Sequence, residues 1–178
     1  MIKNNMETQR LVMTEIESSD IQFIYKGLSH PEVIKYYGVS FHSLEATEEQ
    51  MQWYADLKAN NTGIWWLIRA KETGECYGAC GFNDKNDELR KAEIGFWLLP
   101  DYWGQGIMVE VMPHLLHYGF KALDLNRIEG FVDSENSQCK KALKKAGFLS
   151  EGQMKVHEAG QDIILDVFAK MKTSLSDN

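Results

Sequence analysis

Residues 92–108 of the chain read AEIGFWLLPDYWGQGIM, and this stretch decides the fold. Strand-forming residues fill its first half, and Pro100 then blocks a regular continuation of the strand. Gly104 and Gly106 follow, and apolar residues beyond them recur at helical spacing to about residue 123. The stretch therefore predicts a strand, a glycine turn and a helix that begins at Gly104.

The glycine turn is a candidate binding site. The first N–H groups of a helix have no intrahelical acceptor and lie at the positive end of the helix dipole, so they bind anions. A dinucleotide-binding loop would need a third glycine where the chain has Val109, and no Gly-Lys-Ser or Gly-Lys-Thr sequence is present. The turn is either a site for another phosphate ligand or only a structural turn.

The residues around this stretch indicate an alternation of strands and helices. The pattern predicts strands at 8–16, 63–70, 75–82, 91–99, 126–133 and 160–171. It predicts helices at 18–28 with an extension over 30–38, at 43–61, at 104–123 and at 135–148, with a loop at 83–90. Pro113 should bend the third of these helices or remove a hydrogen bond from it.

This order favours an α/β (α+β) fold with a mixed, largely antiparallel sheet, at least one parallel strand pair and flanking helices. The 178 residues show no internal repeat, and 44% of them are hydrophobic and 25% charged, so one domain over residues 1–178 is expected. Cys76, Cys80 and Cys139 are predicted to be free thiols.

Composition also bears on partners and location. The net charge of −7 disfavours a nucleic-acid ligand, because no broad basic surface is available for phosphate contacts. No apolar run is long enough for a membrane span, and the first residues lack a secretory signal, so we expect a cytoplasmic protein without a membrane partner. His114 and His117 lack a third ligand, so no metal site is expected.

Three segments together resemble a known family. They are METQRLVMTEI at 6–16, AEIGFWLLPDYWGQGIMVEVM at 92–112 and NSQCKKALKKAGFLSEG at 136–152. The combination resembles the acetyl-CoA-binding core of the GNAT N-acetyltransferase superfamily, in particular its RimJ/RimL-like branch. The family frequently has Gln or Arg where this chain has Asp101. The resemblance implies a single GNAT-like domain in which one parallel strand pair splays apart.

The resemblance also implies how acetyl-CoA is held, with no other cofactor. Backbone amides of the turn would hold the pyrophosphate of coenzyme A, and a strand amide near Trp97 or Leu98 would stabilise the oxyanion. Asn136 would cap its helix and contact the pantetheine arm. The residues assigned to the pyrophosphate are Trp103, Gly104, Gln105, Gly106 and Ile107.

Three residues are candidates for the chemistry of acetyl transfer. Glu93 matches the strand glutamate that acts as general base in some family members, and it needs partial burial to work near neutral pH. Cys139 stands where the family has a serine that supplies a proton to the leaving group, while the family's tyrosine acid would fall at Leu143 and is absent. Glu158 is a second candidate base. Each has a structural alternative: an exposed strand acid, a packed cysteine and a loop acid.

We therefore expect an enzyme that transfers an acetyl group from acetyl-CoA to a protein N-terminal amine or a small amine by direct attack, as a monomer or homodimer. The replacement of serine by Cys139 and the absent tyrosine leave open an acyl-CoA-binding module with little activity. A structural subunit with a vacant cleft is a third hypothesis.

Overall fold

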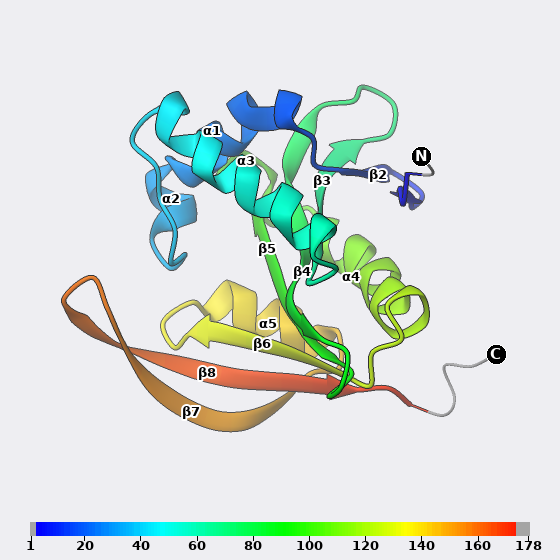
Figure 1. Cartoon of the computed structure of the whole chain (residues 1–178), viewed down its shortest axis with the longest axis vertical. Helices are drawn as coiled ribbons and strands as arrows, with labels where there is room; N and C mark the ends of the chain where they lie inside the picture. The colour runs from blue at the N-terminus through cyan, green and yellow to red at the C-terminus, as the bar shows by residue number, and fades with distance from the viewer. Residues whose placement is uncertain (1–2, 174–178) are drawn as a thin grey trace.

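The computed structural model describes residues 3–173, and within them one eight-stranded sheet runs through the molecule (Figure 1). The strand order is β1-β2-β3-β4-β5-β6-β8-β7, and only the β5–β6 pair is parallel. The mixed, largely antiparallel sheet is thus confirmed. The strands are β1 (Met6–Glu7), β2 (Leu11–Glu15), β3 (Ile64–Ala70), β4 (Cys76–Asn86), β5 (Lys91–Leu98), β6 (Arg127–Asp133), β7 (Leu149–Glu158) and β8 (Gln161–Met171).

Helices cover both faces of the sheet. Figure 1 shows α1, α2 and α3 grouped together, with α3 passing in front of the central strands and the long β7–β8 hairpin at the other end of the view. The α-helices are α1 (Ile21–Leu28), α2 (Pro31–Ile34), α3 (Leu44–Ala59), α4 (Ile107–His117) and α5 (Ser137–Lys145). Short turns η1 (Ser18–Asp20) and η2 (Pro100–Tyr102) precede α1 and follow β5, and the π-helical η3 (Tyr118–Ala122) extends α4.

Strand β3 separates two hydrophobic cores. Trp65 and Leu67 pack with α1, α2 and α3, whereas Trp66 and Ile68 pack with α4 on the opposite face. Successive side chains of a strand point to opposite faces, so a strand covered on both sides is apolar at nearly every position. The continuous run at 64–68 therefore follows from the central place of β3.

Close packing joins α1 to β5. The indole of Trp97 is 5% exposed and stacks on Phe23 at a ring-centroid distance of 5.6 Å. Gly27 faces the same indole, and a Cβ on Gly27 would lie 2.1 Å from the nearest ring atom. Only a residue without a side chain lets α1 approach β5 this closely.

Gly27→Ala should therefore destabilise the fold by about 1–3 kcal/mol, because overpacking forces the indole or the helix to move. Chemical denaturation of both proteins measures the change. Gln22→Ala, on the exposed side of the same helix, is the matched control and should leave stability within about 0.5 kcal/mol. Equal stability of the Gly27 variant and the wild type would show that this contact is not tight.

The prediction that the third helix begins at Gly104 is wrong, since α4 begins at Ile107. Gly104 and Gly106 have φ values of +72° and +73°, which lie outside the right-handed helical region. Pro113 lies inside α4 as expected. It removes the N–H that would bond to the carbonyl of Val109, and Val109 is 58% exposed, so this carbonyl lies near solvent.

Three further boundaries differ from the prediction. Only Pro31–Ile34 of the 30–38 segment is helical, and the expected loop at 83–90 is shortened because β4 continues to Asn86. Strand β7 was not predicted: nine of its ten residues are exposed, so its sequence carries no apolar alternation. It pairs with β8 from Leu149 to Glu158. Cys76, Cys80 and Cys139 are free, as predicted.

Candidate active site

The parallel strands β5 and β6 separate part-way along their length, and we call the place where they separate the fork. Their register joins Lys91–Glu93 to Arg127–Glu129, although β5 continues to Leu98 and β6 to Asp133. Two cavities of about 700 and 600 Å³ lie at this fork. Both are lined by Tyr36, Tyr37, Phe96, Asn136 and Cys139. They are therefore two lobes of one cleft, which we call the Glu93 lobe and the glycine-turn lobe.

The glycine turn forms one end of its lobe. Trp103, Gly104, Gly106 and Ile107 line it, and Gly106 is the N-cap of α4, with no side chain to cap the helix. The first amides of α4 consequently remain available to an anion. Ile107 is 3% exposed, so its contribution is its backbone N–H and not its side chain.

Arg10, in the turn between β1 and β2, holds the glycine turn in place through hydrogen bonds. The guanidinium of Arg10 donates to the carbonyl of Gln105 at 3.1 Å and pairs with Glu110 at 2.7 Å. The side-chain amide of Gln105 donates to the carbonyl of Asp101 at 2.9 Å. Gln105 thus uses its side chain and its carbonyl to hold the turn, and its backbone N–H is the group left to contact a ligand.

Glu93 lies where the two strands part, in its own lobe. Burial is the main cause that raises the pKa of its carboxyl to about 7, and Asp84 and Glu129 raise it further. The amide of Asn83 donates to Glu93 at 3.4 Å and opposes this shift. A carboxyl with a pKa near 7 can accept a proton at neutral pH, which is what a general base requires.

The two strand residues predicted to supply an amide differ in orientation. The N–H of Leu99 donates to the carbonyl of Tyr77 on β4 at 2.9 Å. Because N–H groups alternate along a strand, the N–H of Trp97 also faces β4, while that of Leu98 faces the fork. Trp103 donates its indole N–H to the carbonyl of Leu98 at 2.9 Å, on the same side. Leu98 is therefore the better placed of the two, and Trp97 serves mainly as a packed side chain.

Helix α5 brings Asn136 and Cys139 to the junction of the lobes. The side-chain carbonyl of Asn136 accepts the N–H of Cys139 at 3.2 Å and caps the helix. Burial raises the pKa of the Cys139 thiol to about 12. Glu158 is exposed at the end of β7 and lines neither lobe, but its carboxylate lies next to Gly38, which lines the Glu93 lobe.

Sequence reasoning missed Tyr37, which lines both lobes. Burial raises the pKa of its phenol well above 10, and the charges of Tyr54, Glu93 and Cys139 add to the shift. Tyr36 and Tyr37 follow α2 in a loop, because the helix ends at Ile34. The only signal in the sequence was a pair of aromatic residues before Gly38, which reads equally well as the end of a helix.

Residues 10–149 match the family model described as an acetyltransferase (GNAT) domain. The chain belongs to the GNAT acetyltransferase family. An uncharacterized N-acetyltransferase of Bacillus subtilis, YoaA, is 33% identical over 170 residues, which cover 94% of this chain and 96% of YoaA. The ribosomal-protein-serine acetyltransferase of Escherichia coli is 31% identical over 93 residues, which cover 52% of each chain.

Solved GNAT structures share the whole fold. RimL, a ribosomal L7/L12 alpha-N-protein acetyltransferase, superposes with a TM-score of 0.84 and 20% identity, covering 97% of this chain and 96% of RimL. The Vibrio cholerae spermidine N-acetyltransferase, solved with coenzyme A and spermine, gives 0.80 and 20%, covering 91% and 95%. The single GNAT-like α/β fold with one parallel strand pair is thereby confirmed.

This GNAT protein is an acetyl-CoA-dependent N-acetyltransferase, and acetyl-CoA is its co-substrate. Residues 3–173 contain no group of three side chains that could hold a metal ion. No helix in the same range is long and apolar enough to cross a membrane.

Proposed function

We propose that the fork between β5 and β6 is the site of acetyl transfer, with acetyl-CoA in the glycine-turn lobe and a primary amine in the Glu93 lobe. The observation that carries this assignment is the meeting of the two lobes beside Glu93, whose pKa is about 7. The proposal also treats residues 1–178 as one catalytic unit and places the protein in the cytoplasm. It describes a monomer or homodimer without a nucleic-acid or membrane partner.

The proposed reaction is a direct attack without an acyl-enzyme. The amine nitrogen bonds to the thioester carbonyl carbon and gives its proton to the carboxylate of Glu93. The N–H of Leu98 donates to the oxygen that becomes negative. The carbon–sulfur bond then breaks and coenzyme A leaves as a thiolate. Glu158 is the second candidate for this base: it lines neither lobe, but it lies next to Gly38 of the Glu93 lobe.

Cys139 is proposed to donate a hydrogen bond to the leaving sulfur. A pKa near 12 makes full transfer of its proton to a thiolate unfavourable, because an ordinary thiol has a pKa of about 8.5. An S–H group still donates weakly. The pyrophosphate would bind at the amides from Gly104 to Ile107, with Trp103 lining the same lobe, because the N–H of Trp103 donates to the carbonyl of Pro100 at 3.1 Å. Asn136 would fix the start of α5 beside the pantetheine arm.

The composition of the Glu93 lobe indicates a cationic acceptor. Aromatic side chains and acids line it: Tyr36, Tyr37, Phe41, Trp53, Trp65, Glu49, Glu93 and Asp133. Aromatic faces and carboxylates both attract an ammonium group. Relatives named as ribosomal-protein-serine and spermidine acetyltransferases, 31% and 32% identical over about half of this chain, support a protein N-terminal amine or a polyamine as the acceptor.

An amine panel tests this function. The purified protein would be incubated with acetyl-CoA and either spermidine or a peptide with a free N-terminal serine. Released coenzyme A would be measured with a thiol reagent and the product mass by mass spectrometry. We expect acetylation of at least one amine and none of the same peptide with a blocked N-terminus. Coenzyme A release that never exceeds hydrolysis, with every amine, would refute the proposed function.

Cys139→Ser should keep or increase turnover, because a hydroxyl is a better hydrogen-bond donor than a thiol and occupies slightly less space. Steady-state kinetics of both proteins provides the comparison, and Cys139→Ala, which removes the donor, should be slower than Cys139→Ser. If the serine variant loses most of its activity while the alanine variant does not, Cys139 acts through packing and not as a donor.

A further inference from the structure

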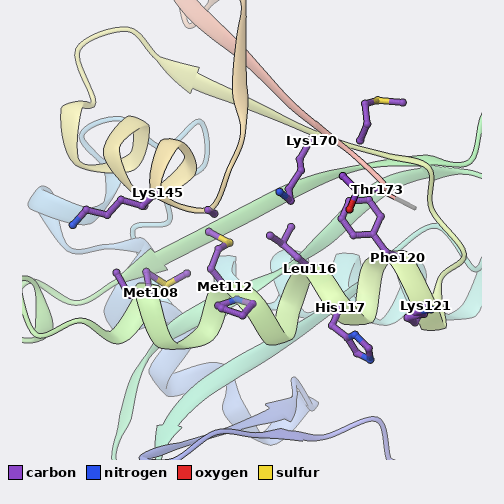
Figure 2. A pocket seen from close by; sticks show the side chains of 14 residues that line it. Met108, Met112, Leu116, His117, Phe120, Lys121, Lys145, Lys170 and Thr173 are labelled. Atoms are coloured by element: carbon purple, nitrogen blue, oxygen red, sulfur yellow. The ribbon is translucent and has the colours of Figure 1, made fainter. Parts of the chain in front are cut away.

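A third cavity, of about 470 Å³, lies between α4, the end of α5 and the end of β8 (Figure 2). Its lining is mostly apolar: Met108, Val109, Met112, Pro113, Leu116, Phe120, Ala142, Ala146 and Met171. Its volume is within the usual range for small-molecule sites. It contains neither Glu93 nor the glycines of the turn, so it is not the proposed catalytic cleft.

The titratable side chains that line this groove are lysines and one histidine. Lys121, Lys145, Lys170 and His117 line it, and no carboxylate from the described part of the chain, residues 3–173, does so. Figure 2 shows Lys170 directed between α4 and α5 toward Met112 and Leu116, whereas Lys145 stands at one end of the groove. The ammonium of Lys170 lies over Gly147, where a Cβ would be only 2.5 Å from it.

Lys170 also differs from the seven lysines of this acidic chain that form ion pairs within residues 3–173. Lys91 and Lys140 pair with Glu129 and Asp166 at 3.0 and 3.1 Å. Within residues 3–173, Lys170 and Lys145 make no ion pair. Lys170 is thus a half-buried cation above an apolar floor, without an ion-pair partner in residues 3–173, and such a group is complementary to an anion that carries a hydrocarbon body.

We propose that this groove binds a small amphipathic carboxylate, with its carboxylate at Lys170 and its aliphatic chain along Met112, Leu116 and Phe120. The groove shares Met108, Val109, Ala142 and Lys145 with the glycine-turn lobe. A ligand in the groove therefore contacts the first turn of α4, which also lines the glycine-turn lobe. Binding of the carboxylate consequently changes the affinity of the protein for acetyl-CoA. The proposal does not depend on which residue is the catalytic base.

Calorimetric titration with octanoate, which carries both features, tests the binding site. We expect saturable binding by the wild-type protein, little binding of the neutral 1-octanol, and a Kd for octanoate raised about tenfold or more in Lys170→Gln. Lys144→Gln is the matched control. Lys144 lies next to Lys145 in the last turn of α5 but lines none of the three cavities, so the Kd of this variant for octanoate should equal the wild-type value.

A second titration, with the protein saturated by coenzyme A, separates the groove from the catalytic cleft. We expect octanoate still to bind, with a changed Kd. Complete loss of octanoate binding would mean that the groove is only an extension of the coenzyme A site. Absence of saturable binding, equal binding of 1-octanol, or an unchanged Kd in Lys170→Gln would likewise overturn the proposal, whatever the result of the amine panel.

Discussion

We expect Glu93→Gln to lower kcat by about 100-fold or more while the Kd for acetyl-CoA stays within about twofold of the wild-type value. Positioned general bases contribute about 10²–10⁴ to rate, and glutamine keeps the shape of the side chain but cannot accept the proton. Glu93 lines the Glu93 lobe and not the glycine-turn lobe, so the co-substrate loses no contact. Steady-state kinetics with acetyl-CoA titration separates the two effects.

The pH dependence supplies an independent check. Because the pKa of Glu93 is raised from 4.5 to about 7, its carboxylate forms as pH rises through about 7, and kcat/KM should rise over that range. The Glu93→Gln variant should lack this rise. In Asp84→Asn the rise should move to lower pH, since Asp84 is one of the groups that raise the pKa. If the pH dependence of kcat/KM in Glu93→Gln equals that of the wild type, another residue is the base.

The same shift predicts a change in stability. A carboxyl whose pKa is raised on folding favours the folded state at pH below 4.5, and this contribution disappears as pH rises through about 7. The Glu93→Gln protein should therefore gain stability relative to wild type as pH rises above neutrality. Thermal unfolding at pH 5 and pH 8.5 gives this comparison and shows at once whether the variant is folded.

Gly104→Asp combined with Gly106→Asp should weaken acetyl-CoA binding by more than about 100-fold. Each new carboxylate would face the pyrophosphate, and like charges about 4 Å apart at a protein surface repel by about 4 kcal/mol. Each tenfold change in affinity corresponds to ~1.4 kcal/mol, so a repulsion of this size weakens binding by more than about 100-fold. A Cβ on Gly104 has no neighbour within 4 Å, so the free protein has room for the side chain. Calorimetry with acetyl-CoA measures the loss.

Gly74→Asp is the control for backbone strain. Gly74 also has a positive φ of 74° and open space around it, but it lies in the turn between β3 and β4 and lines none of the three cavities. This variant should bear the conformational penalty of one such substitution and keep its affinity for acetyl-CoA. An unchanged Kd in the double variant would remove the glycine turn from the proposed site.

The strand, turn and helix at 92–117 could be predicted because each signal is local. Alternation, Pro100, the two glycines and the helical spacing all act within a few residues of one another. The start of the helix was misplaced because apolar spacing does not show that Gly104 and Gly106 adopt positive φ. Strand β7 was missed because an exposed edge strand needs no apolar pattern.

The fork itself could not be predicted from local signals. It depends on where the pairing of Glu93 with Glu129 ends, and these residues lie far apart in the sequence. The pKa of Glu93 likewise depends on Asp84 and on burial by the fold, and the approach of Tyr37 to the cleft depends on the loop after α2. The family resemblance indicated Glu93, the glycine turn and Glu158. In the structure Glu93 and the glycine turn line the cleft, whereas Glu158 lies next to Gly38 of the Glu93 lobe without lining it.

The most direct test of this account is calorimetric titration of the purified wild-type protein with acetyl-CoA and, separately, with NAD. We expect one site per chain with micromolar affinity for acetyl-CoA and no binding of NAD, because the turn lacks the third glycine of a dinucleotide loop. Absence of acetyl-CoA binding, or equal binding of NAD, would contradict the assignment of the cleft at the fork to the acetyl donor.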